Sequence, residues 1–201
     1  QLFTRGGVFL SAWGSTGPRP GRLSSPTAVA VGDSGRVYVT DFNNSRVQVY
    51  GRHDPSVLRV PADFPSIQAA IAAAGPGDTV VVGPGTYFEN VDFRGKPLIL
   101  ASEFVHGGGA ATIAATVIDG RGLASVVNFH NDEDTTCALV GFTLRNGSAY
   151  NGGGVYCSGA GPRLEHLIVR DNTAGFGGGG IGIQYGAYPT ILDCTITANR
   201  A

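Results

Sequence analysis

The chain has 201 residues, a net charge of −1, 42% hydrophobic residues and only 14% charged residues. The near-zero charge excludes the basic surface of a nucleic-acid-binding domain, and the hydrophobic fraction excludes a disordered chain. No apolar run approaches the ~20 residues of a membrane helix, so no membrane span is predicted. The 32 glycines and 11 prolines favour many short strands joined by tight turns.

Residues 1–50 have the pattern of short antiparallel strands. Valines alternate with other residues on both sides of a predicted hairpin turn at 33–35, and Asn43-Asn44 predicts a second turn. The segment resembles the NHL-repeat blades of β-propellers, through Trp13-Gly14, Pro26, Gly35, VYVTD (37–41) and NSRVQVY (44–50). The resemblance implies about one and a half blades, whereas a complete propeller has roughly 4–8. We expect residues 51–57 to form a linker.

Residues 60–93 predict a short helix, a turn and a strand. Ser66 is a suitable N-cap, and Gly75-Pro76 ends the helix. The apolar residues that share one face of this helix are Ile67, Ala70, Ile71 and Ala74. An amphipathic helix here would cap the first coil of a repeat domain, whose apolar end would otherwise be exposed.

The segment HNDEDTT (130–136) is the densest acidic cluster in the chain. Carboxylate oxygens are ligands that calcium prefers, so Asp132, Glu133 and Asp134 are candidate calcium ligands. A solvated acidic loop explains the same residues, because their spacing is neither that of an EF-hand nor that of a repeated nonapeptide. No other cofactor is expected.

Residues 153–172 and 180–199 are two copies of one repeat, aligned without a gap at an offset of 27. The copies share small, turn and apolar positions: Gly159 and Gly186, Pro162 and Pro189, Asn172 and Asn199, Leu167 and Cys194, Val169 and Ile196. An earlier copy at 138–147 has an offset one residue shorter and contains Asn146. Helical spacing is lacking in this region, so the period indicates a parallel β-solenoid with one coil per repeat.

Stacked coils bring equivalent residues into columns about 4.8 Å apart. We therefore expect Asn146, Asn172 and Asn199 to stack at a corner, where asparagine tolerates a left-handed backbone. The expected interior positions include Leu167, Cys194 and Ile196. The stretch GFGGGGIGI (175–183) has the G-x-G-x-x-G spacing of a dinucleotide-binding turn, but strand-like sequence follows where such a turn needs a helix. Its glycines are expected at a coil corner.

Three further sets of residues have both structural and chemical explanations. His166 and Asp193 occupy equivalent positions one coil apart, as either an exposed ion pair or a general acid/base pair. Arg145 and Arg170 are expected on one face. The cysteines at 137, 157 and 194 occupy different coil positions and lack CxxC spacing, so neither a zinc site nor a disulfide ladder is predicted.

The solenoid region resembles a known superfamily. SIQAAI, GDTVVV and GPGTYFENV, followed by PLILAS and VIDGRG, resemble the N-terminal region of right-handed parallel β-helix proteins of the pectin-lyase-like superfamily. GGGV and GGGGI with downstream asparagines are similar to the repeats of polymorphic outer-membrane and adhesin-like proteins. The predicted fold class is all-β: a right-handed parallel β-helix at 58–201 with a capping helix, after a partial NHL segment at 1–50. The chain contains no methionine and no signal-peptide pattern, which indicates a piece of a longer protein, truncated at its C-terminal end.

The resemblance implies a secreted or cell-surface repeat protein whose extended scaffold binds carbohydrate or protein partners. Pectate lyases of the superfamily use an arginine base beside calcium-binding aspartates, and no set of residues here matches them, so no catalytic residue is assigned. The first alternative is a polysaccharide lyase, hydrolase or esterase with active coils beyond this chain, and the second is a spacer without a ligand. The uncapped last coil predicts marginal stability and self-association.

Overall fold

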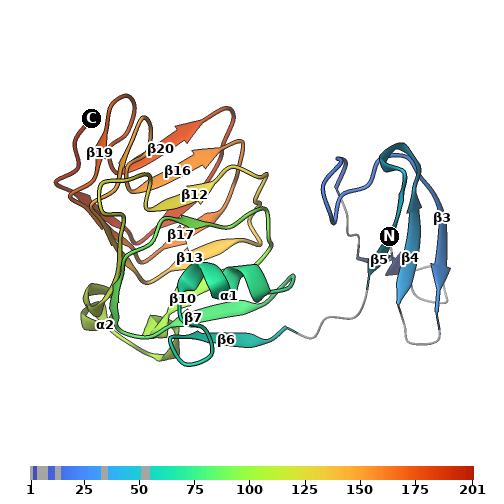
Figure 1. Cartoon of the computed structure of the whole chain (residues 1–201), viewed down its shortest axis with the longest axis horizontal. Coiled ribbons are helices and arrows are strands. Elements are labelled where there is room, and N and C mark those ends of the chain that lie inside the picture. The colour runs from blue at the N-terminus through green and yellow to red at the C-terminus, as the bar shows by residue number, and fades with distance from the viewer. Residues whose placement is uncertain (1, 4–8, 12–14, 33–35, 51–54) are drawn as a thin grey trace. The chain divides into compact units, whose positions relative to one another are not determined.

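The structure is a computed structural model that describes residues 2–3, 9–11, 15–32, 36–50 and 55–201. The chain divides into two compact units, Gln1–His53 and Asp54–Ala201 (Figure 1). The predicted linker at 51–57 falls at this division. Its residues 51–54 lie outside the described residues, and its last residue, Val57, already begins the first strand of the second unit.

The first unit contains two antiparallel sheets. The strand β3 pairs with β4, with Val31 opposite Val37, and β4 pairs with β5. This pairing confirms the predicted strands, although the turn residues 33–35 lie outside the described residues. The second predicted turn forms a short 3-10 helix, η1, which ends at Ser45 in a left-handed conformation. The bounds are β1 Leu2–Phe3, β2 Phe9–Ser11, β3 Pro26–Val31, β4 Val37–Asp41, η1 Phe42–Asn44 and β5 Arg46–Tyr50.

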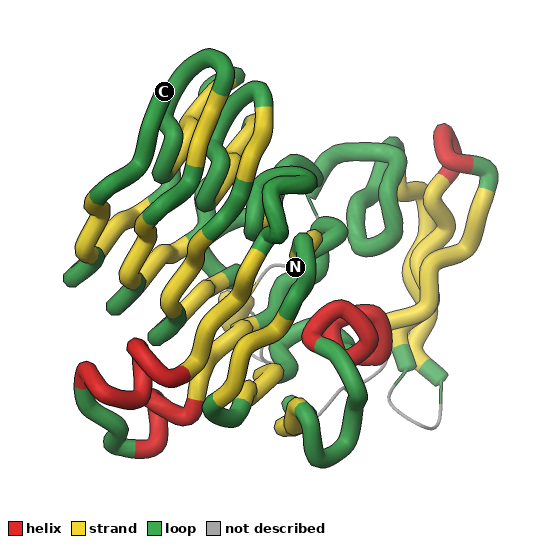
Figure 2. The backbone as a smooth tube through the Cα atoms, turned by 60° about the vertical axis from the view of Figure 1, so that its left-hand side comes forward, coloured by secondary structure: helices red, strands yellow, loops and turns green. Residues whose placement is uncertain are grey.

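The second unit is a parallel β-solenoid with three ladders of stacked strands (Figure 2). The first sheet is β6 (Val57–Val60), β7 (Thr79–Val82), β10 (Ile99–Ser102), β13 (Ala138–Val140), β17 (Arg163–Glu165) and β21 (Thr190–Leu192). The second sheet is β8 (Gly85–Tyr87), β11 (Thr116–Asp119), β14 (Thr143–Arg145), β18 (Ile168–Arg170) and β22 (Thr195–Thr197). The third sheet is β9 (Val91–Asp92), β12 (Val127–Phe129), β16 (Val155–Ser158) and β20 (Ile181–Gln184), and β15 (Ser148–Ala149) pairs with β19 (Thr173–Ala174) at one corner. The all-β solenoid prediction is confirmed.

The chain visits the three sheets in the same order in each coil. Four coils contribute a strand to every sheet, and β21 and β22 begin a fifth coil. Between β10 and β11 the chain leaves the coil to form η2 (Glu103–His106) and α2 (Ala110–Ala115). The repeat pattern did not predict these helices, because they belong to an insertion in one coil.

The helix α1 (Ile67–Ala73) forms where its sequence predicts it. The Ser66 hydroxyl accepts a hydrogen bond from the backbone N–H of Ala69 at 3.1 Å, which is N-cap geometry. All four residues of the predicted apolar face are buried in the core: Ile67, Ala70, Ile71 and Ala74. The helix thereby covers the beginning of the solenoid core.

Apolar columns fill the interior of the coils. One column contains Leu139, Leu164 and Ile191, and another contains Leu144, Val169 and Ile196. The first two members of each column are fully buried, whereas Ile191 is 38% exposed and Ile196 is 49% exposed. The core therefore continues to the last coil, where one side of it is open.

The register between coils differs in part from the predicted one. From 163 onward the offset of 27 is correct, because Leu164 pairs with Ile191. In the third sheet the offset is 26, because Val155 pairs with Ile181. The earlier copy lies 25 residues away rather than 26, because Leu139 pairs with Leu164. Turns of unequal length between coils cause these shifts, and the apolar pattern does not report turn length.

Candidate functional site

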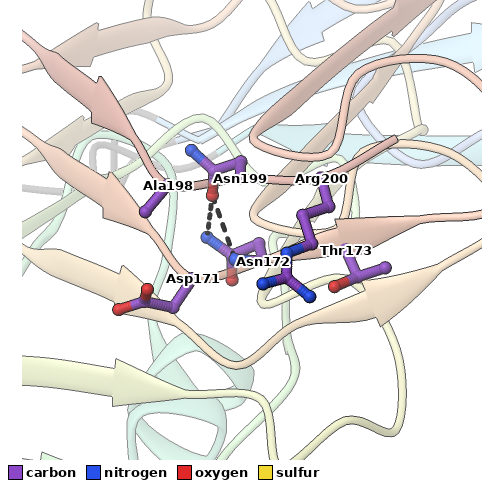
Figure 3. A pocket seen from close by; sticks show the side chains of 6 residues that line it. All are labelled: Asp171, Asn172, Thr173, Ala198, Asn199 and Arg200. Atoms are coloured by element: carbon purple, nitrogen blue, oxygen red, sulfur yellow. Dashed lines mark hydrogen bonds between the residues drawn. The ribbon is translucent and has the colours of Figure 1, made fainter.

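The corner between the second and third sheets carries a short ladder of asparagine side chains. Asn172 is fully buried, and its Oδ1 accepts a hydrogen bond from the backbone N–H of Gly147 at 2.8 Å. In the next coil, Asn199 Oδ1 accepts from both the backbone N–H and the Nδ2 of Asn172, each at 3.0 Å (Figure 3). Each amide also reaches back one coil, since Asn172 Nδ2 donates to the Leu144 carbonyl and Asn199 Nδ2 donates to the Val169 carbonyl.

Asn146 is not part of this ladder, which corrects the predicted three-residue stack. Leu144 pairs with Val169, so Gly147 is the residue aligned with Asn172. Asn146 adopts the left-handed conformation one position earlier, with φ of 55°, and its side chain donates to Asp119 Oδ2 at 2.8 Å. The tolerance of asparagine for this backbone therefore explains Asn146, whereas hydrogen bonds to the backbone of the preceding coil explain Asn172 and Asn199.

The glycine runs pack against the asparagine ladder, and their lack of side chains leaves room for the asparagine amides. A Cβ atom on Gly154 would lie 2.9 Å from Asn172 Nδ2, and one on Gly180 would lie 2.9 Å from Asn199 Nδ2. A Cβ atom on Gly179 would collide with the Arg200 carbonyl. GFGGGGIGI lies at a corner, as predicted, but only its Gly177 has a positive φ. At Gly178, Gly179, Gly180 and Gly182, nearby atoms of the same or a neighbouring coil leave no room for a Cβ atom, so close approach rather than bending requires glycine there.

An open cavity of about 420 Å³ lies at the exposed end of this ladder. Its lining residues are Asp171, Asn172, Thr173, Ala198, Asn199 and Arg200 (Figure 3). These residues belong to two successive coils, so the cavity lies where a further coil would stack.

An acidic and basic column runs beside the ladder on the second sheet. Asp119, Arg145 and Arg170 occupy one position in three successive strands, which confirms that the two arginines lie close together on one face. Arg145 Nε donates to Asp119 Oδ2 at 2.9 Å. Burial by itself raises the pKa of Asp119, but the hydrogen bonds from the Arg121 backbone and from Asn146 and Arg145 outweigh it and lower the pKa. The carboxylate stays ionised and links two coils.

The acidic loop 130–136 uses its carboxylates for internal hydrogen bonds. Glu133 is buried and accepts from the backbone N–H groups of Gly95 at 2.7 Å and of Asn131 at 2.9 Å. Asp134 accepts from the backbone N–H of Thr136 at 2.8 Å. Asp132 is exposed in a left-handed conformation. Within the described ranges, no three histidine, cysteine or acidic side chains gather as metal ligands, and calcium binding by this loop stays a prediction.

His166 and Asp193 lie one coil apart at equivalent left-handed positions, as predicted. Their closest side-chain atoms, Nδ1 and Oδ2, are 3.9 Å apart, and Asp193 is largely exposed. The His166 ring also packs against Phe104, with 4.8 Å between ring centroids. An exposed pair gives little stabilisation, and 3.9 Å is too long for a hydrogen bond between the two side chains.

The three cysteines are free thiols in different surroundings. Burial raises the pKa of Cys137 to about 11 and that of Cys157 to about 12. Cys194 follows Leu167 in the predicted inward position and packs against the core, although it is only partly buried. Burial raises its pKa as well. The cysteines therefore resemble small core residues more than nucleophiles.

Sequence reasoning missed a strip of exposed side chains on the loops that lead from the second to the third sheet. Tyr150 is 73% exposed and stacks on the exposed Phe176, with 5.8 Å between ring centroids and an angle of 17° between the rings. In earlier coils the Arg121 guanidinium lies 5.6 Å from the centroid of the exposed Phe88 ring. We call Phe88, Arg121, Leu123, Tyr150 and Phe176 the corner strip. The sequence contains one signal for this strip: each of these loops has a large apolar or aromatic residue that does not fall on an inward-facing position of the repeat.

Consecutive loops of the strip contact one another through hydrogen bonds. Phe176 donates from its backbone N–H to the Tyr150 carbonyl at 2.7 Å, and Gly122 donates to the Asn146 carbonyl at 2.6 Å. Asn90 Nδ2 donates to the Ser125 carbonyl at 3.0 Å. Hydrogen bonds therefore join these loops from one coil to the next across four coils.

Residues 23–50 match the family model described as NHL repeat. This match confirms the predicted resemblance for that segment, while Trp13-Gly14 lies outside both the matched and the described residues. No curated protein and no solved structure matches the chain. In the described part of the chain, no helix is long and apolar enough to span a membrane. The chain thus carries an NHL repeat followed by a parallel β-solenoid, and the resemblance to pectin-lyase-like proteins stays a prediction.

Proposed function

We propose that the chain is a non-catalytic interaction scaffold of a secreted or cell-surface repeat protein, whose corner strip binds an extended protein segment. The single observation that carries the proposal is that the loops from the second to the third sheet expose a large side chain in each of four successive coils. Since coils are about 4.8 Å apart, this surface extends over roughly 15 Å.

The chemistry of the strip favours a protein partner. Tyrosine, phenylalanine and arginine are enriched in protein interfaces, where rings bury a large area at little entropic cost. Tyr150 and Phe176 already hold each other in a stacked arrangement, so binding orders few additional rotamers. The NHL repeat at residues 23–50 supports the same kind of function, a scaffold for protein interactions.

A display experiment tests the proposal. Peptides selected from a random display library on the whole chain should bind Tyr150→Ser and Phe176→Ser at least about tenfold more weakly, because central aromatic residues dominate interface energies. Tyr185→Ser is the matched control, since Tyr185 is 81% exposed and lies outside the strip. Selected peptides that bind all three variants equally would contradict the proposal.

The carbohydrate and enzyme alternatives need their own measurement. A glycan array and a polygalacturonate lyase assay, each with and without calcium, address them together. Glycan binding that Tyr150→Ser abolishes would assign the strip to carbohydrate instead of protein. Product formation that a chelator abolishes would show an enzyme and overturn the scaffold.

A further inference from the structure

Glycine directly follows asparagine or aspartate at three places in the chain: Asp119-Gly120, Asn146-Gly147 and Asn151-Gly152. In such a pair the backbone nitrogen of the glycine can attack the Cγ carbon of the preceding side chain, because glycine has no Cβ atom to hinder the approach. The nitrogen must give up its proton in this attack, so a hydrogen bond that holds the N–H protects the pair. The three pairs differ in this protection.

Two of the pairs are protected by hydrogen bonds to a neighbouring coil. The Gly120 N–H donates to a backbone carbonyl of the next coil at 3.0 Å. The Gly147 N–H donates to Oδ1 of the fully buried Asn172 at 2.8 Å. The Asn146 amide is itself held by Asp119 Oδ2 at 2.8 Å. Each glycine nitrogen therefore has to lose a hydrogen bond before it attacks, which raises the barrier.

The third pair lacks this protection. Gly152 is buried, yet no described residue accepts a hydrogen bond from its backbone N–H. The adjacent Asn151 Oδ1 is buried as well, and it has no hydrogen-bond partner within the described ranges. The next coil already covers Gly152, since a Cβ atom on Gly182 would lie 2.6 Å from the Gly152 nitrogen. Further coils therefore cannot supply the missing acceptor.

The surroundings of Asn151 favour the attack in two ways. A buried N–H without a partner is costly, and closure of a ring between Gly152 N and Asn151 Cγ removes it. Asn151 Nδ2 donates to Gln184 Oε1 at 3.1 Å, which holds the nitrogen that leaves in the reaction on an acceptor. The Asn151 residue is partly exposed, so water reaches its side chain.

We propose that Asn151 is a deamidation site of the folded chain. The Gly152 nitrogen loses its proton to a solvent base and bonds to Asn151 Cγ, while the Cγ–Nδ2 bond breaks and Nδ2 takes a proton from solvent to leave as ammonia. The product is a cyclic succinimide without the unpaired N–H. Water then opens the ring: addition at Cγ gives aspartate, and addition at the backbone carbonyl gives isoaspartate. One water is consumed and one ammonia is released.

Isoaspartate at this position would also alter the corner strip. It adds one carbon to the main chain beside Gly153, where a Cβ atom would already lie 2.4 Å from the Thr173 carbonyl oxygen. Because the corner has no room for the added carbon, Tyr150, the residue before the site, has to shift against Phe176. The deamidation itself does not depend on what the corner strip binds.

Peptide mapping of the whole chain tests the proposal. Trypsin cleaves after Arg145 and Arg163, so one peptide of residues 146–163 contains both Asn146 and Asn151. After incubation of the folded chain at mildly alkaline pH, tandem mass spectrometry should show deamidation at Asn151 about tenfold faster than at Asn146, because only Asn146 must first break a buried hydrogen bond. In urea the two rates should become similar, since both asparagines precede glycine.

Two variants test the protecting hydrogen bond directly. Asn172→Ala frees the Gly147 N–H and should raise the rate at Asn146 about tenfold in a chain that circular dichroism shows to be folded. Asn199→Ala is the matched control, because the Gly147 N–H keeps its acceptor. If Asn172→Ala does not fold, the comparison within the natural chain decides. Equal rates at Asn146 and Asn151 in the folded natural chain, or deamidation of Asn151 in urea alone, overturn the proposal.

Discussion

At the scale of single residues, burial and register decide what each asparagine does. Asn146 and Asn172 are one coil and one position apart, yet the first is exposed in a left-handed conformation and the second is fully buried. Asn172 satisfies the Gly147 N–H and the Leu144 carbonyl. Buried backbone groups of this kind are costly when they lose their partners.

Replacing Asn172 should therefore destabilise the solenoid far more than replacing Asn146. Asn172→Ala is expected to lower the free energy of unfolding by roughly 2–3 kcal/mol, because two buried backbone groups lose hydrogen bonds. Asn146→Gly keeps the left-handed backbone available and removes the side-chain hydrogen bond to Asp119, so it should cost about 1 kcal/mol. Urea unfolding followed by circular dichroism measures both. Equal losses for the two variants would show that the ladder adds nothing beyond an ordinary corner.

At the scale of elements, α1 is held by charged or polar groups at both ends. Glu89 accepts from the backbone N–H groups of Ile67 and Gln68, each at 2.9 Å. At the other end Lys96 binds three carbonyls, and burial, followed by repulsion from Arg94, lowers its pKa. A seven-residue helix is not stable by itself, so these contacts and the apolar face together keep it on the core.

Removal of the Lys96 ammonium should release the end of α1. Lys96→Met is expected to cost about 2–3 kcal/mol, because the carbonyls lose charged hydrogen bonds while the aliphatic part of the side chain is kept. Arg94→Met removes the same charge from an exposed position nearby and should change stability by less than about 0.5 kcal/mol. Hydrogen exchange of residues 67–74 locates the effect. A loss of protection confined to other coils would contradict this role of Lys96.

At the scale of the whole molecule, each unit contains its own buried carboxylate network. In the first unit Asp41 is fully buried and accepts from Ser24 N, Asn44 Nδ2 and Arg46 Nε at 2.5–2.8 Å. Burial raises the pKa of Asp41, but these hydrogen bonds and one from Gln48 lower it to about 2, from an ordinary value of 3.8. In the second unit, Asp119 is likewise buried, and hydrogen bonds likewise lower its pKa despite burial.

The first unit should lose part of its stability in acid because of Asp41. A carboxyl group with a lowered pKa in the folded state stabilises fully above its unfolded pKa, and this contribution disappears as the pH falls from about 4 to about 2. Hydrogen exchange of residues 24–50 should show this loss in the natural chain. In Asp41→Asn the same residues should be less protected at pH 6 and depend less on pH in that window. Residues 55–201 should respond to pH alike in both proteins, and a difference there would show that the units are coupled.

Much of the fold could be predicted because its signals are local or periodic. The cap and apolar face of α1 lie within nine residues of the chain, and the inward positions of the coils recur in the sequence. The resemblance of the first segment to NHL blades depends on short local motifs such as VYVTD (37–41), and residues 23–50 match that family model. The insertion that contains α2 interrupts the repeat once, and no periodic signal marks it.

Inward apolar residues and recurring turns indicate from the amino-acid sequence that the second unit is a stack of coils, because stacking is how such repeats bury their apolar surface. The register between coils becomes visible in the folded molecule alone, because one or two residues in a turn shift every partner in the next coil. That shift separates Asn146 from the ladder of Asn172 and Asn199. It also brings Tyr150 and Phe176 together, since the chain returns to the same corner 26 residues later, one coil on.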